Sequence, residues 1–116
     1  MSTTIVADNK KTSPIYALRE RKKNEVIDLL REDVNRLRSS DLRVRVLLIG
    51  SFATGDWDSY SDIDVICVSD KQYCETDFKI SGQFPMDVFS LNESEFNQRM
   101  NSGEIFKQSV EKGISL

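Results

Sequence analysis

The sequence predicts one α/β (α+β) domain in which helices pack against a small mixed β-sheet. The chain has 116 residues, which is the length of a single domain. Residues 13–38 carry apolar side chains three or four positions apart, a spacing typical of an amphipathic helix. Short apolar runs at 43–49, 62–68 and 84–91 are typical of strands, and helical spacing returns over 93–113. Elements in this order predict helices layered on a sheet.

The first part of the domain is predicted to be a long helix preceded by a flexible tail. Residues 1–12 are polar and have no period, so the domain itself is expected to span 13–116. Ser13 and Pro14 suit the N-cap and the first position of a helix, and residues 39–41 end it. The expected apolar stripe consists of Leu18, Val26, Ile27, Leu30, Val34 and Leu37.

The middle of the chain is predicted to form the sheet. Residues 43–49 begin with alternating polarity and become continuously apolar, as in a strand that enters a buried sheet. Residues 52–60 are expected to give at most two helical turns and a loop. Residues 62–68 predict a central strand, because both faces become apolar after its start. Weak alternation at 72–80 suggests an edge strand, and 84–91 predicts a further strand.

Two helices are predicted at the C-terminal end. Asn92 and Glu95 have the spacing of a capping box, with Asn in place of Ser or Thr. The helix that follows is expected to end near Gly103. A last helix is expected to end before Gly113.

Composition excludes several classes of chemistry. The chain has no histidine, which excludes Ser-His-Asp and Cys-His catalysis and histidine metal sites. No apolar run is longer than the one at 46–49, so no membrane span or signal peptide is expected. Cys67 and Cys74 are too few for a disulfide scaffold or a four-ligand zinc site, and Cys67 is expected in the core. These features predict a cytoplasmic protein.

The net charge of −3 is unevenly distributed. Residues 1–45 carry 11 basic and 7 acidic side chains, whereas residues 46–116 carry 5 basic and 12 acidic ones. The acidic part argues against binding a nucleic-acid backbone and for binding cations. The basic part could face an acidic partner or form a solvated helix surface.

Two halves of one motif flank the 52–60 segment. Gly50 and Ser51 follow a buried strand, where a glycine lets an anion approach and hydroxyl and N–H groups can donate to phosphate oxygens. Asp62 and Asp64 begin the next strand and would point to the same face. Such a pair repels unless a cation such as Mg²⁺ or Mn²⁺ lies between the carboxylates. An Asp-x-Asp pair alone can be a polar strand start, but the combination predicts a site for a metal-bound nucleoside triphosphate.

Asp87 strengthens this prediction. It is the one charged residue of the segment 81–92, and a buried Asp needs a partner. On a strand beside Asp62 and Asp64 it could complete a two-metal site or accept a proton. The alternative is an edge-strand Asp that faces water or pairs with Lys79.

The motif resembles the nucleotidyltransferase superfamily to which DNA polymerase beta belongs. Gly50-Ser51, ten intervening residues, Asp62-x-Asp64 and Asp87, together with the form GSFATGD…SDIDV and a short two-helix end, are similar to its minimal nucleotidyltransferase branch. The resemblance covers residues 44–113. It implies a polymerase beta-like fold and transfer of a nucleoside monophosphate from a triphosphate such as ATP. It also implies that Gly50 and Ser51 hold the triphosphate, while Asp62, Asp64 and Asp87 carry catalysis and hold two Mg²⁺ ions, with Mn²⁺ as an alternative.

The resemblance also implies a partner. Minimal members often act as the antitoxin of a HEPN-type ribonuclease toxin, and the best-understood ones are similar to enzymes that move AMP onto a tyrosine of the toxin. The acceptor is therefore expected on another polypeptide or a second copy of this chain. Two alternatives stay open: a non-catalytic binding module with a vestigial nucleotide site, and an enzyme for a small molecule such as an antibiotic. Thr54 departs from the pattern, because many relatives carry Arg at this position. How the phosphates are bound there therefore stays open.

Four aromatic residues near the motif could stack on a nucleobase. Trp57 and Tyr60 lie in the polar loop and are candidates for contact with a base or a partner. Phe84 and Phe89 are instead expected in the core.

Overall fold

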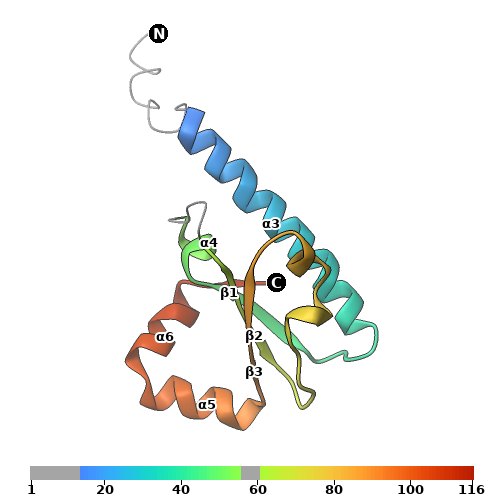
Figure 1. The fold of residues 1–116 in the computed structure, drawn as a ribbon. Coiled ribbons are helices and arrows are strands. Elements are labelled where there is room, and N and C mark those ends of the chain that lie inside the picture. Colours follow the sequence, from blue (N-terminus) through green and yellow to red (C-terminus); the bar gives the residue numbers. More distant parts are fainter. Residues whose placement is uncertain (1–13, 56–60) are drawn as a thin grey trace.

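The computed structural model describes residues 14–55 and 61–116 and has helices on both faces of a β-sheet (Figure 1). The expected N-terminal tail, 1–12, and the loop residues Trp57 and Tyr60 lie outside the described residues. The helices are α3 (Pro14–Arg38), α4 (Ser51–Thr54), α5 (Glu93–Ser102) and α6 (Glu104–Glu111), and two short 3₁₀ helices are η1 (Glu75–Asp77) and η2 (Lys79–Gly82). The strands are β1 (Arg45–Ile49), β2 (Ile63–Val68), β3 (Met86–Leu91) and β4 (Ile114–Ser115).

The sheet is mixed, with the strand order β3-β2-β1-β4. Strand β2 pairs antiparallel with β1 and parallel with β3, as the predicted mixed sheet requires. The register sets Asp64 opposite Ile49 on one side and opposite Asp87 on the other. Strand β4 was not predicted, because two residues carry no readable alternation. It pairs with the outer edge of β1, where Leu48 lies opposite Ile114.

The sheet lies between two layers, each with its own apolar cluster. Helix α3 and the 3₁₀ segments cover one face, and α5 and α6 cover the other (Figure 1). The larger cluster joins α3 to the sheet through residues that include Val26, Leu30, Val34, Val46, Leu48, Ile63, Val65 and Cys67. The smaller cluster consists of Ile66, Val68, Leu91 and Phe96, with Leu47, Ile49, Met100, Phe106 and Val110 packed against it. Cys67 is in the core, as predicted.

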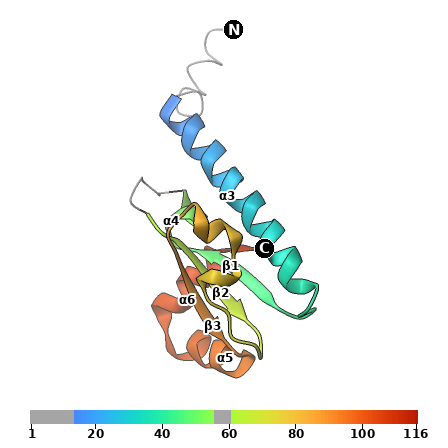
Figure 2. The same ribbon diagram turned by 45° about the vertical axis from the view of Figure 1, so that its right-hand side comes forward.

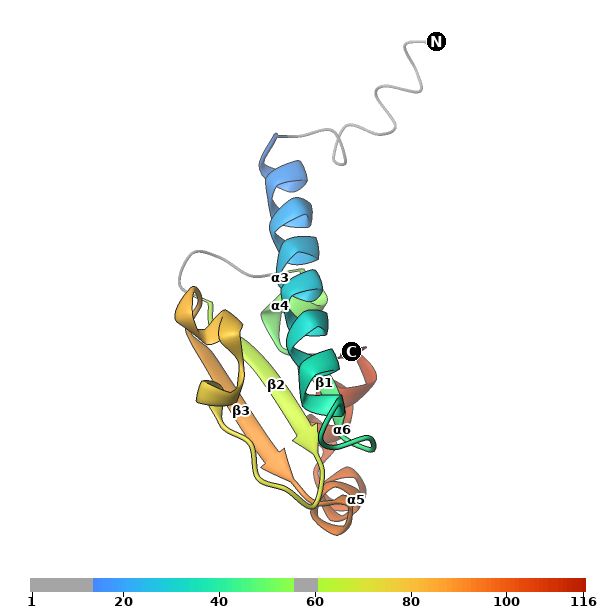
Figure 3. The same ribbon diagram turned by 90° about the vertical axis from the view of Figure 1, so that its right-hand side faces the viewer.

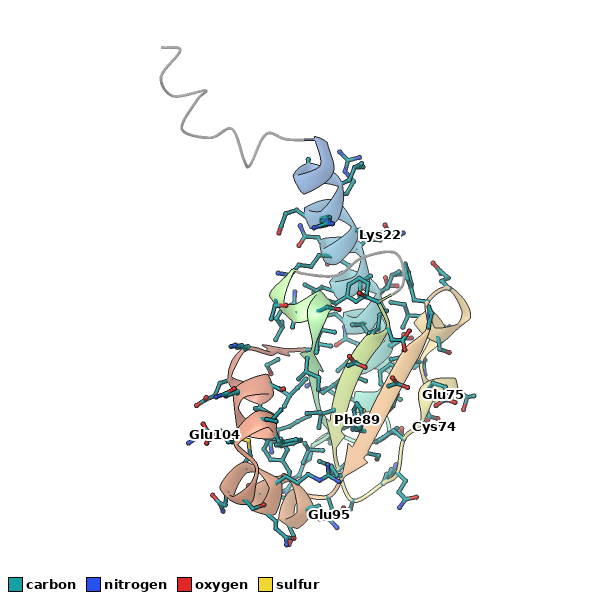
Figure 4. All side chains as sticks on the ribbon, turned by 60° about the vertical axis from the view of Figure 1, so that its left-hand side comes forward. Lys22, Cys74, Glu75, Phe89, Glu95 and Glu104 are labelled. Atoms are coloured by element: carbon teal, nitrogen blue, oxygen red, sulfur yellow. The ribbon has the colours of Figure 1, made fainter. Side chains whose placement is uncertain are left out.

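The N-terminal half of α3 extends past the end of the sheet at which α4 lies (Figures 2 and 3). The predicted helix is confirmed, but its buried apolar side chains begin at Val26, and Leu18 is 60% exposed. Polar residues fill the stretch before Val26, so this part of the helix has little apolar surface to bury. Lys22 lies over Phe84, with its Nζ 4.8 Å from the ring centre, and Figure 4 labels its position on α3.

The predicted edge strand over 72–80 is wrong. This segment forms η1 and η2, and its buried side chains are Phe78 and Ile80. The cause is Asp33 of α3, which is 3% exposed and accepts hydrogen bonds from the backbone N–H groups of Lys79 and Ile80, each at 3.1 Å. Those N–H groups bond to a helix side chain, so they are not donated to a neighbouring strand.

The C-terminal helices follow the prediction. Asn92 Oδ1 accepts from Glu95 N at 2.8 Å, and Glu95 Oε1 accepts from Asn92 N at 2.9 Å, which completes the capping box of α5. Helix α6 follows directly after Gly103. Within the described ranges, no helix combines the length and apolar character needed to cross a membrane.

Candidate functional site

The turn between β1 and α4 depends on a glycine. Gly50 has φ 75° and ψ −157°, a positive-φ conformation that L side chains rarely adopt. A Cβ at this position would lie 2.7 Å from Oδ2 of Asp64 on the neighbouring strand. The sequence pattern predicted that this glycine would make room for an anion. In the fold, the space beside it is taken by the Asp64 carboxylate.

Three carboxylates lie in the neighbourhood of this turn. Asp64 and Asp87 are direct partners across the β2–β3 ladder, so their side chains stand on the same face. Asp62 precedes β2 by one residue. The pKa of Asp64 is raised, first by burial and then by the negative charges of Asp87 and Asp62. The structure thus brings the three predicted acids together around a half-buried Asp64.

Asp87 differs from the prediction in its surroundings. Strand β3 is the outer strand of the sheet on that side, and Asp87 is exposed rather than buried. No ion pair joins it to Lys79 among residues 14–55 and 61–116. An exposed position needs no partner for the charge, so its place opposite Asp64 is set by strand register.

The donor chemistry at this end of the sheet suits a hard divalent cation. The three acids offer only carboxylate oxygens, the ligands that Mg²⁺ and Mn²⁺ prefer. Asp64 has two acidic neighbours that raise its pKa, and a bound cation would relieve that repulsion. In the described part of the chain, however, no three acidic or thiol side chains close into a tight ligand cluster. The donor types therefore fit a divalent cation, and Asp62, Asp64 and Asp87 are the residues that would hold it.

The predicted phosphate-binding residues lie on the first turn of α4. Ser51 is half-buried, and no hydrogen bond from its hydroxyl is found to the rest of the described chain. The Thr54 hydroxyl contacts the backbone oxygen of Ser51 at 3.3 Å, so it takes part in the turn itself. Sequence reasoning missed Gln108 of the last helix and Lys112 just after it, which line a hollow beside Gly50 and Thr54. Their i, i+4 spacing was visible, but which way that helix faces was not.

The aromatic residues divide in a way that the sequence did not predict. Phe84 packs, partly buried, against the larger core cluster, as predicted. Phe89 is 44% exposed, so its placement in the core is wrong. It shares a face of β3 with Asp87, two residues away, and that part of the sheet is incompletely covered (Figure 4).

Comparisons with known proteins identify the family. The sequence matches the nucleotidyltransferase domain family over residues 27–111, which is most of the chain. No curated protein matches it significantly. A Sulfolobus solfataricus crystal structure with a provisional nucleotidyltransferase assignment aligns with 84% of each chain, a TM-score of 0.52 and 24% identity. That likeness supports the fold. The chain belongs to the nucleotidyltransferase domain family, as a minimal nucleotidyltransferase.

Proposed function

We propose that this nucleotidyltransferase transfers AMP from ATP to a hydroxyl group of a partner protein, with divalent metal ions bound by Asp62, Asp64 and Asp87. One observation carries the proposal. Asp64 is half-buried beside two other carboxylates, which is costly for the fold unless a cation binds there.

Each residue has a separate task in this reaction. Asp62 and Asp64 hold the cations, and Asp87 adds a third carboxylate that can also accept the proton of the attacking hydroxyl. Ser51 and the N–H groups of its turn orient the phosphates, and Gly50 leaves space for the Asp64 carboxylate. Bound Mg²⁺ would neutralise the phosphate charge and polarise the α-phosphoryl group. The acceptor oxygen displaces pyrophosphate, so the chain supplies positioning and charge rather than a covalent intermediate.

The proposed acceptor is a tyrosine of a HEPN-type toxin, with this chain as its antitoxin. This choice rests on the resemblance to minimal nucleotidyltransferases. It is supported by the open surroundings of the acids, because Asp62 and Asp87 are exposed and Phe89 offers apolar surface next to them. A protein surface could therefore reach the acids without displacing a described element of this fold.

The test is intact-mass measurement of the protein encoded by the adjacent gene, after incubation with this protein, ATP and Mg²⁺. We expect a gain of one or more AMP units. Asp64→Asn should lower the rate about a hundred- to thousandfold, on the scale of removing one key electrostatic group. Asp70→Asn, just beyond the other end of β2, should leave the rate unchanged.

Three outcomes would contradict parts of the proposal. Neutralisation of the toxin by the Asp64→Asn protein, without a mass change, would favour a non-catalytic binding module. AMP transfer to an aminoglycoside but to no protein would favour a small-molecule enzyme. Equal rates for wild type and Asp64→Asn would contradict the assigned site.

A further inference from the structure

A small hollow lies beside the candidate site, between the first turn of α4 and the last helix. Its volume is about 150 Å³. Pockets that hold a whole drug-sized ligand are about 300–1,000 Å³, so this one is too small for a nucleotide but large enough for part of a phosphate chain. Its lining consists of Gly50, Thr54, Ile105, Gln108, Ser109 and Lys112.

Helix α6 presents one stripe to this hollow. Positions 105, 108 and 109 are three or four apart and lie on one helix face, and Lys112, the C-cap residue just after α6, continues that stripe. The opposite face carries Phe106 and Val110, which pack against the smaller core cluster. The orientation of α6 is thus set by its apolar contacts, and the stripe that carries Gln108 and Ser109 faces Gly50.

The end of α6 is held close to the sheet. A Cβ on Gly113 would lie 2.8 Å from the backbone oxygen of Leu48, so only glycine lets the chain pass there. The next residue, Ile114, pairs with Leu48 as part of β4. Lys112 is therefore attached between a packed helix and a strand, rather than to a loose end of the chain.

The charge of the hollow is opposite to that of the acid cluster. Lys112 is the only ionisable group among the described residues that line it, and no acid lines it. In the part of the chain that the structure describes, its ammonium forms no ion pair. Gly50 separates the two environments, because it lines the hollow and also borders the Asp64 carboxylate.

We propose that Lys112 binds the β- and γ-phosphates of the nucleoside triphosphate, on the far side of the Gly50 turn from the three carboxylates. This inference rests on the proposed function and extends it to a binding residue outside the motif. A single cation next to a phosphate chain favours the triphosphate over the monophosphate. The Gln108 amide on the same stripe can donate a further hydrogen bond to these oxygens.

The test is the affinity of three probes, ATP, AMP and inorganic tripolyphosphate, measured by calorimetry in the presence of Mg²⁺. Lys112→Gln should weaken the binding of ATP and of tripolyphosphate about ten- to a hundredfold, on the scale of one charge-assisted hydrogen bond. It should change the affinity for AMP less than about twofold. Lys112→Arg, which keeps the charge, should retain most of the affinity for ATP. Lys107→Gln is the matched control, because it removes the same charge from the same helix outside the hollow.

The outcomes separate this inference from the proposed function. If wild type binds ATP and Lys112→Gln binds it equally well, the role of Lys112 is overturned and the proposed function stands. If Lys112→Gln loses affinity for ATP and for AMP equally, or melts well below the Lys107→Gln protein, Lys112 stabilises the fold rather than binding phosphate. The inference then fails. If wild type binds no nucleotide, both are overturned.

Discussion

The two ends of the sheet treat their carboxylates in opposite ways. At one end, Asp41 accepts hydrogen bonds from the hydroxyls of Ser69 and Tyr73, and these two bonds are the largest causes of its lowered pKa. At the other end, Asp64 has a raised pKa because it is partly buried and faces Asp87 and Asp62. At one end the surroundings of the aspartate thus stabilise its charged form, and at the other end they destabilise it.

This difference indicates which acids the fold needs. Like Asp41, Asp33 has hydrogen-bond donors around its carboxylate. It accepts from Arg36 Nη2 at 2.8 Å and from two backbone N–H groups. Groups with such partners stabilise the native state, whereas clustered like charges lower its stability. An unfavourable cluster at one end, with satisfied acids elsewhere, makes that end the candidate functional site.

The largest expected effect on stability comes from removing the best-satisfied acid. Asp33→Ala leaves two backbone N–H groups of the 72–80 segment without acceptors inside the fold. It should lower the free energy of unfolding by about 2–4 kcal/mol, which corresponds to about 10 °C or more in the melting temperature. The control is Asp28→Ala, an exposed acid on the same helix. Similar melting temperatures for both variants would contradict the role assigned to Asp33.

The next effect compares two glycines that flank α4. Gly50 and Gly55 both have positive φ, but an added Cβ meets Asp64 only at Gly50. Gly55→Ala should cost about 1–2 kcal/mol of unfolding free energy, and Gly50→Ala about 1 kcal/mol more. Chemical denaturation measures both. In an Asp64→Ala background the difference should shrink, and an unchanged difference would contradict the proposed contact.

The smallest expected effects are those of Asp41 and Asp64 on pH-dependent stability, and they should have opposite signs. The folded pKa of Asp41 is lowered, so its contribution to stability is present above the ordinary value of 3.8 and is lost as the pH falls through the folded pKa. The folded pKa of Asp64 is raised, so stability falls as the pH rises from 3.8 through that pKa. At pH 7 without metal, Asp41→Asn should therefore lower the melting temperature slightly and Asp64→Asn should raise it. Both differences should vanish in strong acid, and equal signs at pH 7 would contradict the comparison.

Much of the fold could be predicted because it depends on local pattern. The 62–68 apolar run, the spacing of α3 and the capping box at Asn92 each specify their element within a few neighbouring residues. The placement of Asp62 and Asp64 followed from the period of a strand. The proximity of Asp87 required only that its strand be next to theirs.

The rest depends on contacts between distant segments. The 3₁₀ turn at 79–82 begins with N–H groups that donate to Asp33, more than forty residues earlier in the chain. The exposure of Phe89 depends on how much of β3 the last two helices cover, and the position of Lys112 depends on which face of α6 is buried. Strand β4 exists because β1 offers an open edge. None of these features can be predicted from a short stretch of neighbouring residues.

The most direct test of the central claim is thermal unfolding with and without Mg²⁺ and ATP. If the acid cluster exists to bind a metal–nucleotide complex, saturating Mg-ATP at a hundred times its Kd should stabilise wild type by about 2.7 kcal/mol, or several degrees. The Asp62→Asn, Asp64→Asn double variant should melt at or above the wild-type temperature without ligand and show no shift with it. A wild-type melting temperature that stays unchanged at millimolar Mg-ATP would contradict the account.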